Sequence, residues 1–60
     1  MNMERPKIGS MWKHKNLSGT IIRIIPATGI KGIAYVYLKD GHTGGCNSCE
    51  WFYSDWDRLN

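Results

Sequence analysis

The sequence predicts an all-β domain built on one small, strongly bent antiparallel sheet. A run of four isoleucines in five positions over 21–25, bounded by Gly19 and Pro26, favours a strand because β-branched side chains pack well on a pleated surface. Apolar residues also dominate the stretch 33–38. Glycine-bearing turns and loops separate these stretches, at 16–19, 27–32 and 40–41.

Alternation of residue types gives the first predicted strand, 11–15, its orientation. Trp12 and His14 fall on one side of the strand, and Lys13 and Lys15 fall on the other. We expect the Trp12 side to face the core.

Arg23 orients the isoleucine strand, because a charged side chain is rarely buried without a partner. Ile22 and Ile24 then face the core. Ile21 and Ile25 lie on the Arg23 side, so either the ends of the strand coil inward or these two residues belong to a contact surface.

The predicted strand 33–38 takes its orientation from Lys39, which we expect to be solvated. That choice sends three side chains inward, namely Ala34, Val36 and Leu38. It sends two rings and one cation outward, namely Tyr35, Tyr37 and Lys39.

The C-terminal third is predicted to contain one more strand and a helical turn. The stretch 43–48 is too rich in glycine and polar residues for a regular element. Residues 49–53 are predicted as a strand from their aromatic content. Residues 54–59 are predicted as a helical or 3₁₀ turn, with Ser54 as its N-cap.

Sixty residues make one domain, with a flexible N-terminus over 1–6 and a single barrel domain over 7–60. A chain of this size buries only about 60% of the surface that it exposes when unfolded. Three Trp, three Tyr and one Phe compensate, because aromatic rings bury large areas. Curling of the short strands into a barrel protects the edges of the sheet.

Eight Lys and Arg against five Asp and Glu give a net charge of +3, which favours anionic partners. No apolar run approaches the roughly 18–20 residues that a membrane span needs. The N-terminus lacks the apolar core of a signal peptide. We therefore expect a cytoplasmic protein without membrane contacts, and reduced cysteines.

Three stretches carry a family resemblance: KIGSMWKHKNLSGTIIRII, AYVYL and the closing WFYSDWDRL. Together they resemble small phage and prophage proteins of the Src-homology-3-like (SH3-like) barrel type, over residues 7 to 59. The loop from Gly41 to Cys49 has no counterpart in that pattern. The resemblance implies an SH3-like barrel of four to five short strands, phage origin, and a host cytoplasm as its location; the family is largely without assigned chemistry.

The predicted strand orientations place six basic and aromatic side chains on one outer surface: Lys13, Lys15, Arg23, Tyr35, Tyr37 and Lys39. Three interpretations remain open. The surface is an ordinary solvated face, a docking site for a protein partner, or a site for single-stranded nucleic acid, in which bases stack on rings and cations meet phosphates.

A second candidate site is formed by His42, Cys46 and Cys49. Two thiolates at the Cys-x2-Cys spacing can meet one tetrahedral zinc ion, but a closed site needs four ligands, and His14 is the only other histidine. A redox-active pair is a further alternative. We favour ordinary reduced cysteines and no cofactor.

No catalytic motif is recognisable, and Asp55 and Asp57 fit capping better than acid-base chemistry. The sequence therefore predicts a non-catalytic accessory module, monomeric or homodimeric, that docks on a protein partner and inhibits or regulates it. Single-stranded nucleic-acid binding is the alternative, and a zinc-stabilised mini-domain is the third possibility.

Overall fold

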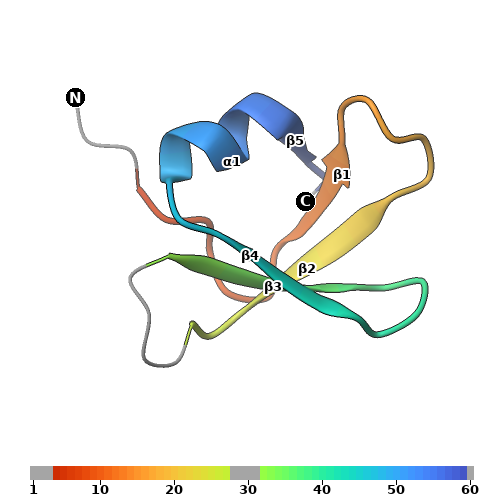
Figure 1. Cartoon of the computed structure of the whole chain (residues 1–60), viewed down its shortest axis with the longest axis horizontal. Coiled ribbons are helices and arrows are strands. Elements are labelled where there is room, and N and C mark those ends of the chain that lie inside the picture. The colour runs from red at the N-terminus through yellow and green to blue at the C-terminus, as the bar shows by residue number, and fades with distance from the viewer. Residues whose placement is uncertain (1–3, 28–31, 60) are drawn as a thin grey trace.

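The computed structural model describes residues 4–27 and 32–59 (Figure 1). The elements follow one another along the chain as β1 (Met11–His14), β2 (Ile21–Ile25), β3 (Ile33–Tyr37), β4 (Thr43–Cys46), α1 (Cys49–Asp55) and β5 (Trp56–Arg58). The strands form one antiparallel sheet in the order β4-β3-β2-β1-β5. The predicted small, barrel-like all-β fold with a short helical element is confirmed.

Two of the predicted turns contain a glycine with positive φ. Gly19 has φ 79° between β1 and β2, and Gly41 has φ 77° between β3 and β4. Side chains other than glycine rarely adopt this backbone conformation. The predicted loop 27–32 lies mostly outside the described residues.

The orientations predicted for β1 and β2 are confirmed. Trp12 pairs with Ile22, and both side chains are buried. Arg23 is exposed on the opposite face, where it pairs with Met11 on β1. In β1 and β2 the charged residue within the strand thus marks its solvent side.

The prediction for 49–53 is wrong: this segment is the helix α1 and not a strand. The helical turn predicted over 54–59 is also wrong beyond Asp55, because Trp56–Arg58 is the strand β5. Ser48, rather than Ser54, is the N-cap, and its hydroxyl accepts a hydrogen bond from the Trp51 backbone N–H at 3.4 Å. The apolar residues Cys49, Phe52 and Trp56 recur at the spacing of one helical face. Burial of that face outweighs the β-propensity of the aromatic run.

The prediction of an irregular segment over 43–48 is also wrong, because Thr43–Cys46 is the strand β4. Its glycines pack closely against β3. A Cβ atom on Gly44 would lie 2.9 Å from Cε1 of Tyr35, and one on Gly45 would lie 3.0 Å from the carbonyl oxygen of Ile33. The two glycines thus allow close approach rather than disorder.

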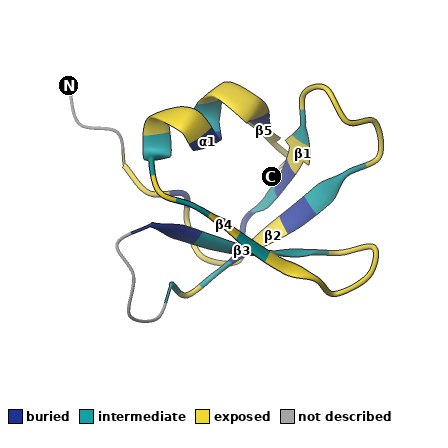
Figure 2. Ribbon diagram, viewed as in Figure 1, coloured by how far each residue is buried: buried dark blue, intermediate teal, exposed yellow. Residues whose placement is uncertain are grey.

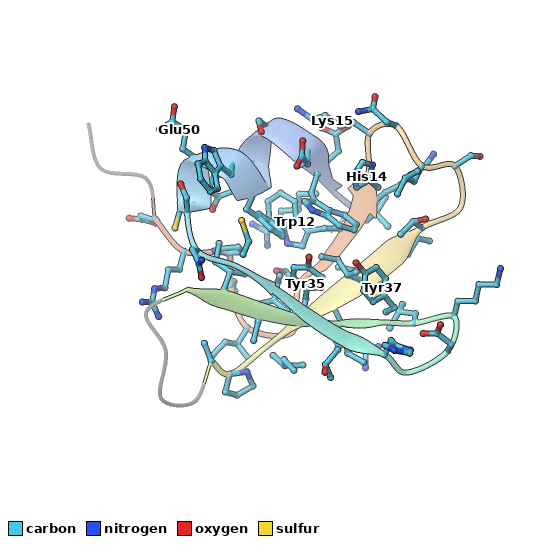
Figure 3. All side chains as sticks on the ribbon, viewed as in Figure 1. Trp12, His14, Lys15, Tyr35, Tyr37 and Glu50 are labelled. Carbon is cyan, nitrogen blue, oxygen red and sulfur yellow. The ribbon has the colours of Figure 1, made fainter. Side chains whose placement is uncertain are left out.

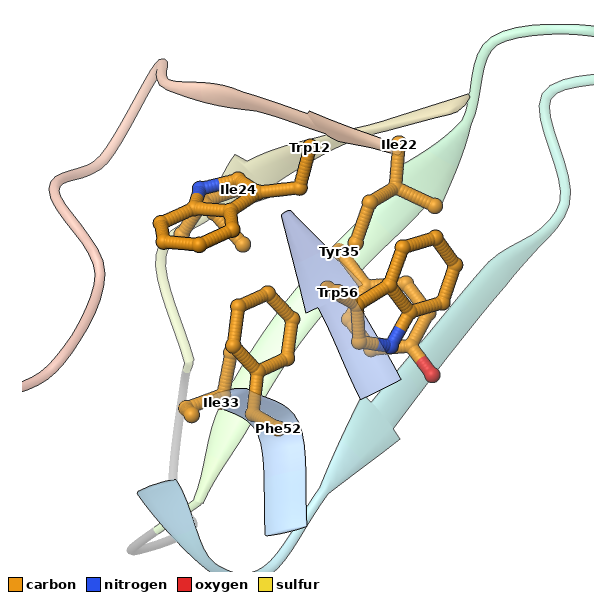
Figure 4. Packing of buried hydrophobic residues seen from close by; sticks show 7 residues of the cluster. All are labelled: Trp12, Ile22, Ile24, Ile33, Tyr35, Phe52 and Trp56. Atoms are coloured by element: carbon orange, nitrogen blue, oxygen red, sulfur yellow. The ribbon is translucent and has the colours of Figure 1, made fainter. Parts of the chain in front are cut away.

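The core lies between the sheet and α1 (Figures 2 and 4). Its buried members are Trp12, Ile22, Ile24, Ile33, Tyr35, Phe52 and Trp56. We call the side of the sheet that carries Trp12, Ile22, Ile24, Ile33, Tyr35 and Tyr37 the inner face. The Phe52 ring is fully buried and meets the Trp12 ring edge-on, with centroids 5.0 Å apart.

Buried Ser10 anchors Trp12. The Ser10 hydroxyl accepts a hydrogen bond from Nε1 of Trp12 at 2.9 Å and donates one to the Lys7 carbonyl. Every buried side-chain polar atom among the described residues has a partner. This matters in a small core, since an unpaired buried donor costs about 1–3 kcal/mol.

The segment that precedes β1 lies against the helix side of the domain. The Tyr53 hydroxyl donates a 2.7 Å hydrogen bond to the Glu4 carbonyl, and Pro6 is buried. Flexibility was predicted for residues 1–6, and residues 1–3 of that stretch lie outside the described residues.

Candidate functional site

The strand pairing separates the six side chains that were predicted to share one surface. Figure 3 shows three of them, with Lys15 lying apart from Tyr35 and Tyr37. Lys13 and Arg23 are exposed on the face opposite Trp12. Lys15 follows β1 and forms an ion pair with Asp57, with 3.8 Å between Nζ and Oδ1. Lys39 is exposed in the turn between β3 and β4.

The predicted outward orientation of Tyr35 and Tyr37 is wrong. Tyr35 pairs with Ile24 and Tyr37 with Ile22, which places both rings on the inner face. Tyr35 is buried, and Tyr37 packs half-buried against the core. Val36 and Leu38 were predicted to point inward. Val36 is instead half-buried on the opposite face, and the Leu38 side chain is 43% exposed.

The error has a physical cause: Lys39 lies beyond the end of β3, so its exposure does not report on the strand. Two consecutive residues without side chains on β4 leave room for a large ring beside them. Tyr35 occupies that room, because Gly44 is its cross-strand partner. The missing side chain at Gly44 thus leaves room for Tyr35 on the face where Ile33 and Tyr35 are buried in the core.

Tyr35 and Tyr37 form a pair. Their rings meet edge-on with centroids 5.6 Å apart. Burial raises the pKa of Tyr35 to about 12, and a hydrogen bond with the Tyr37 side chain adds to the shift. These contacts hold the Tyr35 ring in the core, where no base can stack on it.

The side of the sheet opposite the core carries mostly aliphatic residues, and we call it the outer face: Met11, Lys13, Ile21, Arg23, Ile25, Ala34, Val36 and Thr43. Arg23 lies near its centre, between Met11 on β1 and Val36 on β3. The aliphatic residues around it are half-buried. Ile21 and Ile25 lie half-buried on this face, and their part in a contact surface stays a prediction.

A groove of about 280 Å³ adjoins the outer face at Ile21. It lies between the β1–β2 turn and the β3–β4 turn, and Leu17, Tyr37 and Lys39 are among its lining residues. Leu17 is 57% exposed. Two of the predicted residues, Tyr37 and Lys39, are thus brought together here, in a partly apolar groove.

His14 organises the β1–β2 turn. Its Nδ1 accepts hydrogen bonds from the backbone N–H groups of Asn16 and Leu17, each at 3.0 Å. Its ring meets that of Trp56 edge-on at 4.7 Å. This geometry gives His14 a structural role.

The three zinc candidates do not come together. His42 precedes β4 and lies close to Asp40, whereas Cys46 ends β4 and Cys49 begins α1. Both thiols are free, and that of Cys46 contacts the Ser48 carbonyl at 3.2 Å. Over residues 4–27 and 32–59 there is no group of three or more potential ligands from His, Cys, Asp and Glu.

Sequence reasoning missed Ala34, Val36 and Leu17 as surface residues, and it missed Trp51. Trp51 is 65% exposed on α1, beside the fully buried Phe52. Recognising the helical spacing of 49, 52 and 56 would have placed Trp51 on the solvent side.

The fold and the outer face define a small all-β, barrel-like domain with an aliphatic, arginine-centred surface. None of the helices in the described part of the chain has the length and apolarity to cross a membrane. Comparison with protein-family models, curated proteins and solved structures found no match to this chain.

Proposed function

We propose that this chain is a non-catalytic module that binds a partner protein through the outer face of its sheet. The observation that carries the proposal is the grouping of Ile21, Ile25, Ala34 and Val36 around exposed Arg23, on the face opposite the core. Aliphatic surface with a central arginine suits a protein interface, because apolar contacts provide the affinity and a guanidinium orients an acidic group.

The orientation of the tyrosines favours a protein over single-stranded nucleic acid. Single-stranded nucleic acid would bind this face by stacking its bases on exposed rings, and Tyr35 is buried. The outer face keeps the cations Lys13 and Arg23, which suit an acidic protein surface equally well. The net charge of +3 supports an acidic partner in the same way.

The resemblance to phage and prophage proteins supports a host factor as the partner, met in the host cytoplasm. Such a module acts by occupying a surface of its partner, and it inhibits or regulates that partner without turnover. The proposed mode of action does not involve a metal ion.

Affinity capture with matched variants tests the proposal. The immobilised protein is compared with Arg23→Glu, Arg23→Lys and Trp51→Ala, and retained host proteins are quantified. We expect a protein that the wild type and Trp51→Ala retain, that Arg23→Glu loses by at least tenfold, and that Arg23→Lys retains in part. Equal retention by Arg23→Glu contradicts the proposal, and loss in Trp51→Ala alone assigns binding to α1 instead.

A salt titration separates the nucleic-acid alternative. A labelled oligothymidine is mixed with the protein, and binding is followed by fluorescence anisotropy as salt is raised. We expect no saturable binding at low salt. Binding that falls steeply with salt and is weakened by Arg23→Glu would support the alternative instead.

A further inference from the structure

The strand β4 forms one edge of the open sheet. The Tyr37 N–H donates to the His42 carbonyl at 2.7 Å, so the alternation of an antiparallel ladder directs the backbone groups of Gly44 and Cys46 toward β3 as well. The N–H and C=O groups of Thr43 and Gly45 point the other way. Both residues are exposed, and no described residue is seen to bond these outward groups.

The two edges of the sheet differ in their chemistry. The edge β5 has three residues, and two of them, Asp57 and Arg58, are charged and exposed. Short length and charge are the usual protections of an edge strand. The edge β4 carries the sequence Thr-Gly-Gly-Cys, which holds no charge and no proline. It is the unprotected edge of the two.

We propose that β4 pairs with β4 of a second copy of this chain, antiparallel and centred on Gly44. This register places Thr43 of each copy opposite Gly45 of the other. The outward N–H and C=O groups of these residues then form four hydrogen bonds across a two-fold axis. The two Gly44 residues face each other, so no side chains crowd one another at the centre of the pairing.

Charge argues for a second copy at this edge and against one at β5. In the β4 register, His42 lies opposite Cys46 of the other copy, and no like charges meet along the paired strands. Pairing of β5 about its middle residue would set Asp57 against Asp57, which is destabilising. The pairing joins two sheets into one and sets two outer faces on a common surface.

Light scattering with a pair of variants tests the inference under reducing conditions. Thr43→Pro removes an outward donor without removing a bond to β3, and proline is tolerated on the solvent side of an edge strand. Thr43→Val keeps that donor and changes only the side chain. From micromolar to millimolar protein, we expect the wild type and Thr43→Val to rise from the mass of one chain to that of two, and Thr43→Pro to stay at one.

Circular dichroism establishes that Thr43→Pro is folded. If Thr43→Pro is not folded, hydrogen exchange of the wild type tests the pairing instead. We expect the backbone amides of Thr43 and Gly45 to become protected from exchange as protein concentration rises, and the amide of Arg58 on β5 to stay unchanged. A wild type that stays at one chain at millimolar concentration overturns the inference, and so does a mass beyond two chains. Arg23 lies on β2, away from this edge, so Arg23→Glu should leave the association unchanged. The light-scattering result and the capture result can therefore succeed or fail separately.

Discussion

The two faces of the sheet are both apolar, yet only one of them forms the core. The inner face presents large rings, including Trp12 and Tyr35, and α1 covers it with Phe52. The outer face presents smaller aliphatic side chains, such as Ala34 and Val36, around Arg23. On the sheet itself, the large rings therefore lie on the inner face and the outer face carries none, and each buried ring removes a large area from water.

Two adjacent isoleucines give the largest expected contrast between the faces. Ile22 is fully buried on the inner face, and Ile21 is half-buried on the outer face. Ile22→Ala should lower the free energy of unfolding by about 2–5 kcal/mol, because it removes buried methyl groups and leaves a cavity. Ile21→Ala should lower it by clearly less. Urea denaturation measures both, and equal losses would show that the outer face is covered.

The buried hydrogen bonds of Ser10 give the next largest effect. Ser10→Ala leaves Nε1 of Trp12 without its acceptor, which should cost about 1–3 kcal/mol. Ser54→Ala is the matched control, since the exposed Ser54 hydroxyl donates to the Trp51 carbonyl and water can replace it. A Ser10→Ala protein as stable as Ser54→Ala would mean that the indole finds another acceptor.

The smallest effect concerns Tyr35 and depends on pH. Tyr35→Phe removes the hydrogen bond with Tyr37 and should cost about 0.5–1.5 kcal/mol at neutral pH. The folded chain raises the pKa of Tyr35 from 10.0 to about 12. Between these values the unfolded chain releases its proton first, so stability is complete below pH 10 and falls as pH rises toward 12.

Urea denaturation across this alkaline range compares the wild type with Tyr35→Phe. The variant should lose less stability with rising pH. Some dependence of stability on pH should remain in the variant, because burial also raises the pKa of Tyr53. Identical slopes for the two proteins would place the ionising Tyr35 hydroxyl in water.

The sequence predicted the fold class and the orientation of the first two strands, because each of those strands contains a cation that marks its solvent side. Lys13 lies within β1 and Arg23 within β2. β3 contains no charged residue that marks its solvent side, and its rings pack into the core where Gly44 of β4 leaves room for Tyr35. Sequence reasoning without coordinates could not weigh that contact.

The C-terminal third was mispredicted because local preference and packing disagree there. The run Trp51-Phe52-Tyr53 favours a strand by propensity, whereas the spacing of Phe52 and Trp56 is helical. Of the candidate surface, the cations and the outward position of Ile21 and Ile25 were predicted. The aliphatic residues of β3 were not, because the strand was turned over.

The close approach of Gly44 to Tyr35 has a consequence for how the hairpin of β3 and β4 selects its alignment. If β4 slid by two residues, His42 or Cys46 would lie under the Tyr35 ring, and the Cβ atom of either would collide with it. A slide by one residue would reverse the faces of every β4 side chain. The absence of a Cβ atom at Gly44 thus admits the Tyr35 ring at the observed alignment and excludes the alignments shifted by two residues in either direction.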